Sequence, residues 1–449
     1  MIDIKDFKEK IFKEAEKAGF TSYEIYFVRG NSFEAHVFEG ELSQYKNSAP
    51  MGLSFRGVYE NKMGYAYTEH VDESVIELLI KNAKENSMII EQMHEILFKG
   101  DESYPEAEEV SPLLNKVSAE EKIEMAKSIE KTALEADDRV KSVDYAVVAT
   151  GESEVYIANS YGLSLDQSTG YVVATVSVRA EENGKVKVGS ETWGGRDFED
   201  FKIENLSQKA VKRAVSQLDA ESIKSGEYNI VLENKMAVSL IGAFSSVFFA
   251  ETVQKGFSLL KDKVGEQIAS NIVTIRDDIS HPKSLQSLSF DSEGVAVYNK
   301  VVVENGVLKT YLYNLKAASK ENRKSTGNGF KGSFKSAVGT SCINFYIDPT
   351  NFSLENMLSN MGSGVFITNL AGLHSGINVV SGDFSLSADG FVVEDGKVTR
   401  PVEQITIAGN FYDLLKNIDA IADDLYFSIG GETIGSPSIL VSKVTVSGL

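Results

Sequence analysis

Cysteine, basic charge and long apolar runs are scarce in this sequence, and each scarcity rules out a class of protein. A single cysteine, Cys342, among 449 residues excludes an internal disulfide. Its place in the alternating run 340–345 predicts a buried structural thiol rather than a nucleophile. Lysine and arginine number 45 against 65 aspartates and glutamates, which leaves a formal charge of −20. Because this charge would repel a phosphate backbone, we expect no nucleic-acid partner.

Long hydrophobic runs are also missing. The longest apolar-leaning stretch, 237–250, is interrupted by Ser239, Ser245 and Ser246, and it is shorter than the roughly 20 residues of a spanning helix. The first residues have no charged region followed by an apolar segment, so they do not resemble a signal peptide. We therefore expect no membrane partner and a cytoplasmic location.

Local motifs for catalysis are scarce as well. The five histidines have no pair at metal-ligand spacing, and His94-Glu95 begins like H-E-x-x-H without a second histidine. No G-x-S-x-G nucleophile elbow occurs. Carboxylate clusters could form from the acidic residues Asp277, Asp278, Asp291 and Glu293, for which a solvated turn is the simpler interpretation. Taken alone, these residues identify no catalytic group.

What the sequence does contain is the pattern of a globular α+β protein. Apolar residues make up 42% and charged residues 24%, and the length predicts two or three domains. We divide the chain into an N-terminal domain, 1–222, with a mixed sheet and helices, and a C-terminal domain, 223–449, rich in antiparallel meanders with a few helices. Helices are predicted at 4–18, 73–86, 118–136, 198–218, 239–251, 353–360 and 412–421.

Strands are predicted between these helices by alternation and by turn residues. Hairpins are expected where Asn305-Gly306 and Asp395-Gly396 separate alternating runs. Strands expected in the first half lie at 22–29, 32–38, 52–59, 64–69, 140–149, 154–159, 171–180 and 185–191.

A glycine-rich segment, 327–332, matches the pattern G-x-G-x-x-G. A dinucleotide site needs a strand before this pattern and a helix after it, and neither is predicted here. A turn-rich loop is the structural interpretation, and a loop that covers a groove is the functional one. The candidates for peptide contact in such a groove are Thr326, Gly327 and Asn328.

Runs along nearly the whole chain resemble the TldD/PmbA family, the microcin-processing peptidases also called modulators of DNA gyrase. In the second half they are 257–260, 263–267, 290–295, 303–311, 324–328, 381–385, 401–403, 405–410, 417–418 and 423–425. In the first half they are 23–26, 52–56 and 155–162. The order and spacing of these runs make the resemblance specific.

The resemblance implies a zinc peptidase for the TldD branch, with H-E-x-x-x-H on a helix and a cysteine near the C-terminus. The three motif positions fall on Ile241, Gly242 and Ser246 in this chain, and no cysteine follows Leu425. Because zinc needs nitrogen, sulfur or oxygen ligands, we expect no metal, no other cofactor and no catalytic residue here. The chain resembles the PmbA (TldE) branch, and zinc is expected in its TldD-like partner.

Three functions remain open at this point. The first is a non-catalytic subunit that pairs with a TldD-like metallopeptidase and helps to hold unfolded peptides for processing or degradation. The second is an active hydrolase whose metal ligands are assembled from scattered residues. The third is a homodimer that binds a peptide or another ligand without proteolysis. Around the motif, the aromatic and aliphatic residues Phe244, Val247, Phe248 and Phe249 are expected to fill the volume that a metal pocket needs.

Overall fold

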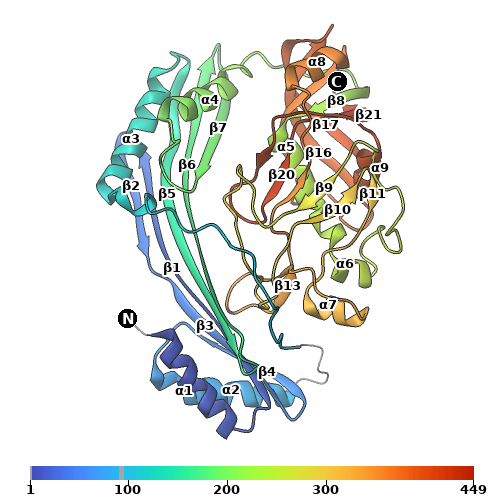
Figure 1. The fold of residues 1–449 in the computed structure, drawn as a ribbon. Helices are drawn as coiled ribbons and strands as arrows, with labels where there is room; N and C mark the ends of the chain where they lie inside the picture. The colour runs from blue at the N-terminus through green and yellow to red at the C-terminus, as the bar shows by residue number, and fades with distance from the viewer. Residues whose placement is uncertain (1–2, 90–95) are drawn as a thin grey trace.

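The protein is described here by a computed structural model that covers residues 3–89 and 96–449. The expected α+β fold is confirmed, and two parts lie side by side (Figure 1). A long, curved sheet with four helices occupies residues 3–222, and a more compact set of sheets follows. The motif His94-Glu95 lies outside the described residues. The division into two domains at residue 222 stays a prediction.

The N-terminal part is a seven-stranded sheet with the order β4-β3-β1-β5-β6-β7, and β2 pairs with β1 beside β3. All of its strand pairs are antiparallel, so the predicted mixed sheet is wrong. Strands that follow one another in hairpins must run in opposite directions. The strands are β1 (Ser22–Phe38), β2 (Glu41–Ser48), β3 (Met51–Tyr59), β4 (Lys62–Thr68), β5 (Val140–Asn159), β6 (Ser164–Glu182) and β7 (Lys185–Gly195).

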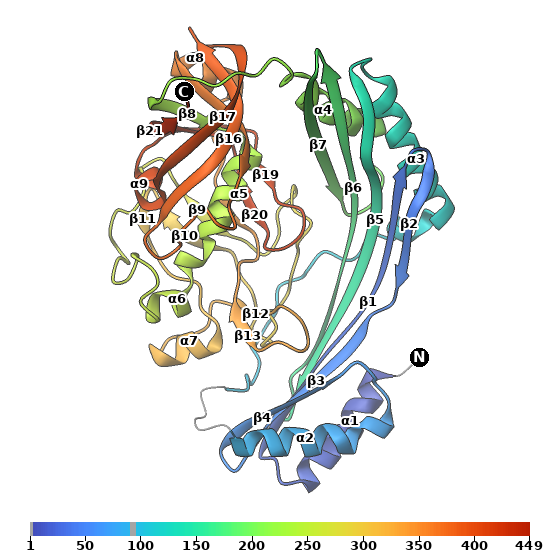
Figure 2. The same ribbon diagram turned by 180° about the vertical axis from the view of Figure 1, so that it is seen from behind.

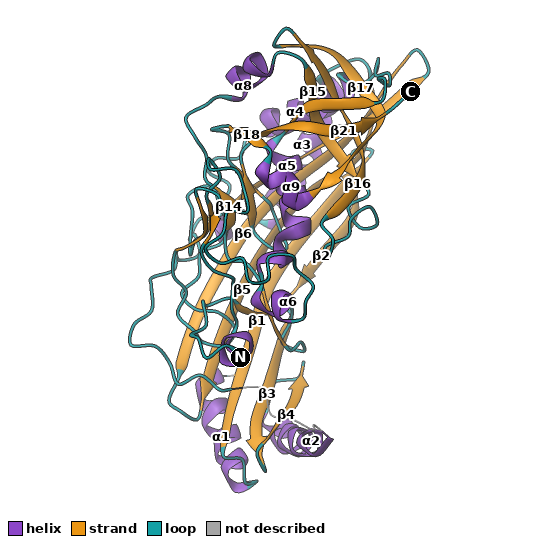
Figure 3. Ribbon diagram, turned by 90° about the vertical axis from the view of Figure 1, so that its right-hand side faces the viewer, coloured by secondary structure: helices purple, strands orange, loops and turns teal. Residues whose placement is uncertain are grey.

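Strands β1, β5 and β6 are unusually long, with 17, 20 and 19 residues. They extend along much of the molecule (Figure 3). The predicted strands 22–29 and 32–38 are one continuous strand, β1, which passes through Gly30. A Cβ atom at Gly30 would lie 2.7 Å from the carbonyl oxygen of Glu152 on β5. The glycine therefore permits a close approach between two strands instead of marking a turn.

Four helices cover one face of this sheet, two at each end (Figure 1, Figure 2). They are α1 (Ile4–Lys17), α2 (Ile76–Ile89), α3 (Ala119–Glu135) and α4 (Ile203–Val215), with a short 3-10 turn, η1 (Glu73–Val75), before α2. Side chains of β1 that bury against the helices alternate along the strand, with Ile25 and Phe27 at one end and Val37 at the other. The predicted capping box of α3 is present, because Ser118 and Glu121 bond reciprocally.

The C-terminal part contains two six-stranded sheets and the hairpin β12-β13. One sheet has the order β11-β10-β9-β14-β20-β19. The other has the order β17-β16-β15-β8-β21-β18, and β17 also pairs with β21, so that five of its strands close into a ring. The meander β15-β16-β17 is antiparallel as expected, whereas β8–β15 and β14–β20 are parallel pairs. The buried apolar side chains between these elements form the largest core of the protein.

The elements of this part follow the predictions unevenly. The hairpins at Asn305-Gly306 and Asp395-Gly396 are confirmed, with positive φ at all four residues. The predicted helix 412–421 is partly wrong, because α9 ends at residue 416 and β18 follows.

The strands are β8 (Gly226–Leu232), β9 (Ile275–Asp277), β10 (Lys300–Glu304), β11 (Val307–Leu308), β12 (Gly329–Lys331), β13 (Val338–Thr340), β14 (Phe345–Ile347), β15 (Gly364–Ala371), β16 (Asp383–Glu394), β17 (Lys397–Asn410), β18 (Ile418–Ile421), β19 (Tyr426–Phe427), β20 (Ile434–Ser436) and β21 (Ile439–Ser447). The helices are α5 (Asn234–Phe244), α6 (Ala250–Gln254), α7 (Leu315–Lys320), α8 (Leu354–Met361) and α9 (Phe411–Lys416).

Side chains from both parts meet along the open face of the long sheet. The hydroxyl groups of Tyr26 on β1 and Ser292 are 3.3 Å apart, and the Lys331 Nζ atom donates to Ser54 Oγ at 3.1 Å. The β12-β13 hairpin thus reaches the N-terminal sheet. In the described residues, no helix is both long and apolar enough to cross a membrane.

Candidate functional site

The segment that carries the family's motif positions is bent rather than one continuous helix. Helix α5 ends at Phe244 and is followed by a 3-10 turn, η3 (Ser245–Phe248), and by α6. The break falls at Phe249, whose backbone is extended and forms a bridge with Leu312. The Leu312 N–H donates to the carbonyl oxygen of Phe248, and the Ala250 N–H donates to the carbonyl oxygen of Leu312, both at 2.9 Å. The predicted helix 239–251 is therefore interrupted.

The three motif positions lie on this bent segment and do not fit zinc. Ile241 is 2% exposed and packs in the main core. Gly242 faces Ile434, whose Cγ1 atom would lie 3.4 Å from an added Cβ atom. Ser246 is half-buried in η3. An aliphatic side chain, a hydrogen and one neutral hydroxyl supply no zinc ligand set and no general base.

The volume around the bend is filled by aromatic rings, as predicted. Phe244 stacks on Phe411 with ring centroids 4.6 Å apart, and Phe248 packs against Phe345 at 5.3 Å. Each of these four side chains is at most 1% exposed. Rings that are packed in this way leave no room for a bound ion and its ligands.

Hydroxyl groups and carboxylates form a hydrogen-bond network beside the bend. Ser245 and Ser341 each donate to one oxygen of Glu432 at 2.9 Å. Thr340 donates to Glu251 at 3.3 Å. These bonds tie η3 and the residue after β13 to the loop before β20, and they tie β13 to α6. In the part of the chain that the structure describes, no three His, Cys, Asp or Glu side chains group as metal ligands. This arrangement can hold the segment in place and contains no activated nucleophile.

A buried carboxylate pair was missed by the sequence analysis. Asp291 and Glu293 are only 1% and 4% exposed, so the interpretation as a solvated turn is wrong. Asp291 accepts hydrogen bonds from three backbone N–H groups, and the Glu293 Oε2 atom accepts one from the nitrogen of Leu315 at 2.7 Å. Burial raises the pKa of both groups, and the charge of Asp291 raises the pKa of Glu293 further. The apolar neighbours in the sequence were the only signal of this burial.

The beginning of the glycine-rich segment, 327–329, is also buried. Asn328 donates from Nδ2 to Asp277 at 2.8 Å and accepts from the hydroxyl of Thr326 at 2.7 Å. Lys300 completes the network by donating to Asp277 at 3.1 Å. Thr326, Gly327 and Asn328 therefore lie inside the fold, and their role in peptide contact stays a prediction. Cys342, near Asp277, is buried as expected, and burial raises the pKa of its thiol.

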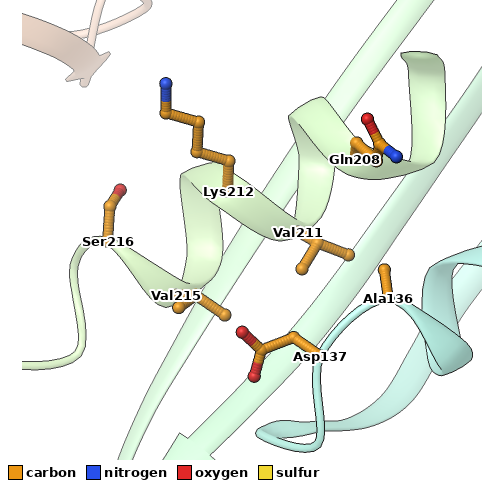
Figure 4. A pocket seen from close by; sticks show the side chains of 7 residues that line it. All are labelled: Ala136, Asp137, Gln208, Val211, Lys212, Val215 and Ser216. Carbon is orange, nitrogen blue, oxygen red and sulfur yellow. The ribbon is translucent and has the colours of Figure 1, made fainter. Parts of the chain in front are cut away.

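A shallow surface pocket lies far from the bend, between the end of α3 and helix α4 (Figure 4). It measures about 290 Å³, and its charged lining residues are Asp137 and Lys212. Asp137 already binds Arg139 at 2.8 Å, and this hydrogen bond lowers the pKa of Asp137 to about 2. With its carboxylate engaged, the pocket offers no set of catalytic groups.

Comparison with known proteins covers nearly the whole chain. Three family models of the PmbA/TldA metallopeptidase match this chain. Domain 1 matches residues 23–87, the central domain 112–218 and the C-terminal domain 225–448. A Haemophilus influenzae relative named as a metalloprotease PmbA homolog is 28% identical, with 94% of this chain and 90% of that protein covered.

Two solved structures have the same fold. One is a Thermotoga maritima protein named as a modulator of a DNA gyrase, with a TM-score of 0.91, 33% identity and coverage of 99% of this chain and 100% of that one. The other is TldE of Thermococcus kodakarensis, with a TM-score of 0.90, 23% identity and coverage of 98% and 100%.

Proposed function

The chain belongs to the PmbA/TldD family of metallopeptidases, and we propose that it is a cytoplasmic, PmbA/TldE-type subunit without a zinc site of its own. In this proposal it pairs with a TldD-like subunit that carries the zinc, and the pair processes or degrades unfolded peptides. In this proposal the chain itself binds and orients the peptide, and it does not cleave peptide bonds.

One observation carries the proposal: the residues at the motif positions cannot ligate a metal. Ile241 is buried in the core, and Gly242 has no side chain. The remaining position, Ser246, offers one neutral hydroxyl, whereas a catalytic zinc needs three protein ligands and a general base nearby. The stacked rings of Phe244 and Phe411 occupy the adjoining volume.

Peptide handling is supported by the sheets of the C-terminal part. Strand β19 ends one six-stranded sheet, and within the described residues it has no partner strand on its outer side. The outer side of β11, at the opposite end of this sheet, is already hydrogen-bonded to residues 265–268. An extended peptide can add to such an edge through main-chain hydrogen bonds, whatever its sequence. This mode of binding suits a subunit that presents unfolded chains.

The proposal predicts activity only in the mixed complex. We expect an unstructured fluorogenic peptide to be cleaved at least about tenfold faster by an equimolar mixture of this chain and a TldD-like relative than by either alone, a difference of about 1.4 kcal/mol in the barrier. The measurement is the initial rate at fixed zinc. The control is a mixture in which the relative has lost its H-E-x-x-x-H histidines, and it should be inactive. Cleavage by this chain alone, or an unchanged rate on mixing, would contradict the proposal.

A further inference from the structure

Strand β2 (Glu41–Ser48) is an open edge of the N-terminal sheet. Its only partner among the described strands is β1. Residues 41–47 are all exposed, in contrast to the alternating burial of β1. Large apolar side chains are among them, with Leu42 40% and Tyr45 49% exposed. The unpaired backbone groups of such an edge are a template for another strand.

A bulge near the middle of β2 sets which way its side chains point. Leu42 is opposite Val37 of β1, and Gln44 is opposite His36, so that Ser43 is an extra residue without a partner. An extra residue interrupts the alternation of faces at that point. In a regular strand, residues an odd number of positions apart lie on opposite faces of the sheet. Across this bulge in β2, they lie on the same face.

The bulge makes the side-chain pattern of β2 symmetric. Glu41 and Lys46 fall on one face of the sheet, opposite Phe38 and Glu34 of β1. Leu42 and Tyr45 fall on the other face. Read from either end, the order is charged, apolar, then the central Ser43-Gln44, then apolar and charged.

We propose that a second copy of this chain pairs with β2 through its own β2, antiparallel, about a two-fold axis between Ser43 and Gln44. Glu41 of each copy then lies opposite Lys46 of the other. Leu42 lies opposite Tyr45 in the same way. Residues that are directly opposite in an antiparallel pair share a face, and the bulge satisfies this condition for both pairs. Two ion pairs and two apolar pairs thereby join the sheets into one.

The charge complementarity of β2 with itself favours a second copy over an unrelated strand. A bulge usually discourages pairing at an edge, but here the two bulges meet at the axis and leave every residue from 41 to 46 with one partner. A pair of short strands is smaller than the roughly 1,200 Å² of a standard interface. We therefore expect a dimer that dissociates on dilution.

The test is sedimentation velocity across a range of concentrations with charge-reversed variants. Either E41K or K46E should weaken the dimer at least about tenfold, because like charges then lie opposite twice. The double variant E41K/K46E should restore the dimer. Matched controls are E124K and K127E on α3, which reverse one partner of an exposed ion pair, carry the same changes in net charge and should leave the dimer unchanged.

Three outcomes would overturn the pairing: a wild-type chain that stays monomeric, single variants as tight as wild type, or a double variant that stays weak. A second readout covers any variant that fails to fold. Ser43→Cys should form a disulfide-linked dimer on oxidation, and the wild type should not, since its only thiol, Cys342, is buried. No catalytic assay enters the test, so a monomeric chain that still activates a TldD-like subunit would refute the pairing and leave the proposed function intact.

Discussion

Replacing Arg213 by alanine is expected to lower the free energy of unfolding by about 3–5 kcal/mol. Arg213 lies on α4 in the N-terminal part and reaches Glu233, just before α5. Its Nη2 atom donates to both oxygens of that carboxylate at 2.9 and 3.0 Å, and its Nε atom donates to Glu191 at 3.2 Å. The Glu191 side chain is only 8% exposed. Without the arginine, two poorly solvated carboxylates would face each other, with Lys235 the remaining cation at Glu191.

This prediction is checked by urea denaturation followed by fluorescence and circular dichroism. The matched control is Arg179→Ala, which removes a pair with Asp144 at 3.3 Å whose side chains are 47% and 31% exposed. That change should cost less than about 1 kcal/mol. A loss below 1 kcal/mol for Arg213→Ala would show that the cluster does not hold the two parts together.

The second large effect concerns pH. Burial and the neighbouring Asp291 raise the pKa of Glu293 to about 8, whereas an unfolded glutamate titrates near 4.3. A raised pKa in the folded state means that the stabilisation is complete below the unfolded pKa and is lost as pH rises through about 8. Burial also raises the pKa of Asp291, to about 7, so we expect the free energy of unfolding to fall by at least about 1.4 kcal/mol per pH unit between pH 5 and 8. Glu293→Gln removes one of the two raised ionisations and keeps an oxygen for the Leu315 nitrogen, so the slope should become shallower by about 1.4 kcal/mol per pH unit.

Urea midpoints at pH 5, 6, 7 and 8 measure this slope for the wild type and the variant. Glu304→Gln is the control, because its hydrogen bond to Lys309 lowers the pKa of Glu304 and places its titration below this window. Its slope should equal that of the wild type. A wild-type stability that is level or rising from pH 5 to 8 would contradict a shared, buried proton on these carboxylates.

Features of the fold that depend on local chemistry could be predicted from the sequence. The hairpin turns at Asn305-Gly306 and Asp395-Gly396 and the capping box at Ser118 are of this kind. Two strands, 140–149 and 154–159, were predicted where the structure has one continuous strand, β5, which passes through Gly151. In the structure a Cβ atom there would lie 2.5 Å from the ring of Tyr171 on β6. The glycine makes room for a cross-strand ring, which local sequence does not reveal.

The candidate site also has some features that the sequence predicts and others that only the fold creates. The positions Ile241, Gly242 and Ser246 followed from the resemblance, and the packing of the phenylalanines followed from their hydrophobicity. The bend at Phe249 was not predictable, since it depends on a backbone bridge to Leu312, far along the chain. The burial of Asp291 and Glu293 likewise was not predictable, since it depends on contacts with Gly329 and Leu315, which only the fold brings close.

The zinc content of the purified chain shows whether this protein holds a metal ion of its own. The chain is incubated with excess zinc, dialysed against a weak chelator and analysed by mass spectrometry beside a TldD-like relative that carries H-E-x-x-x-H. We expect about one zinc per chain in the relative and only a background amount in this protein. Retention of about one zinc per chain by this protein alone would contradict this expectation.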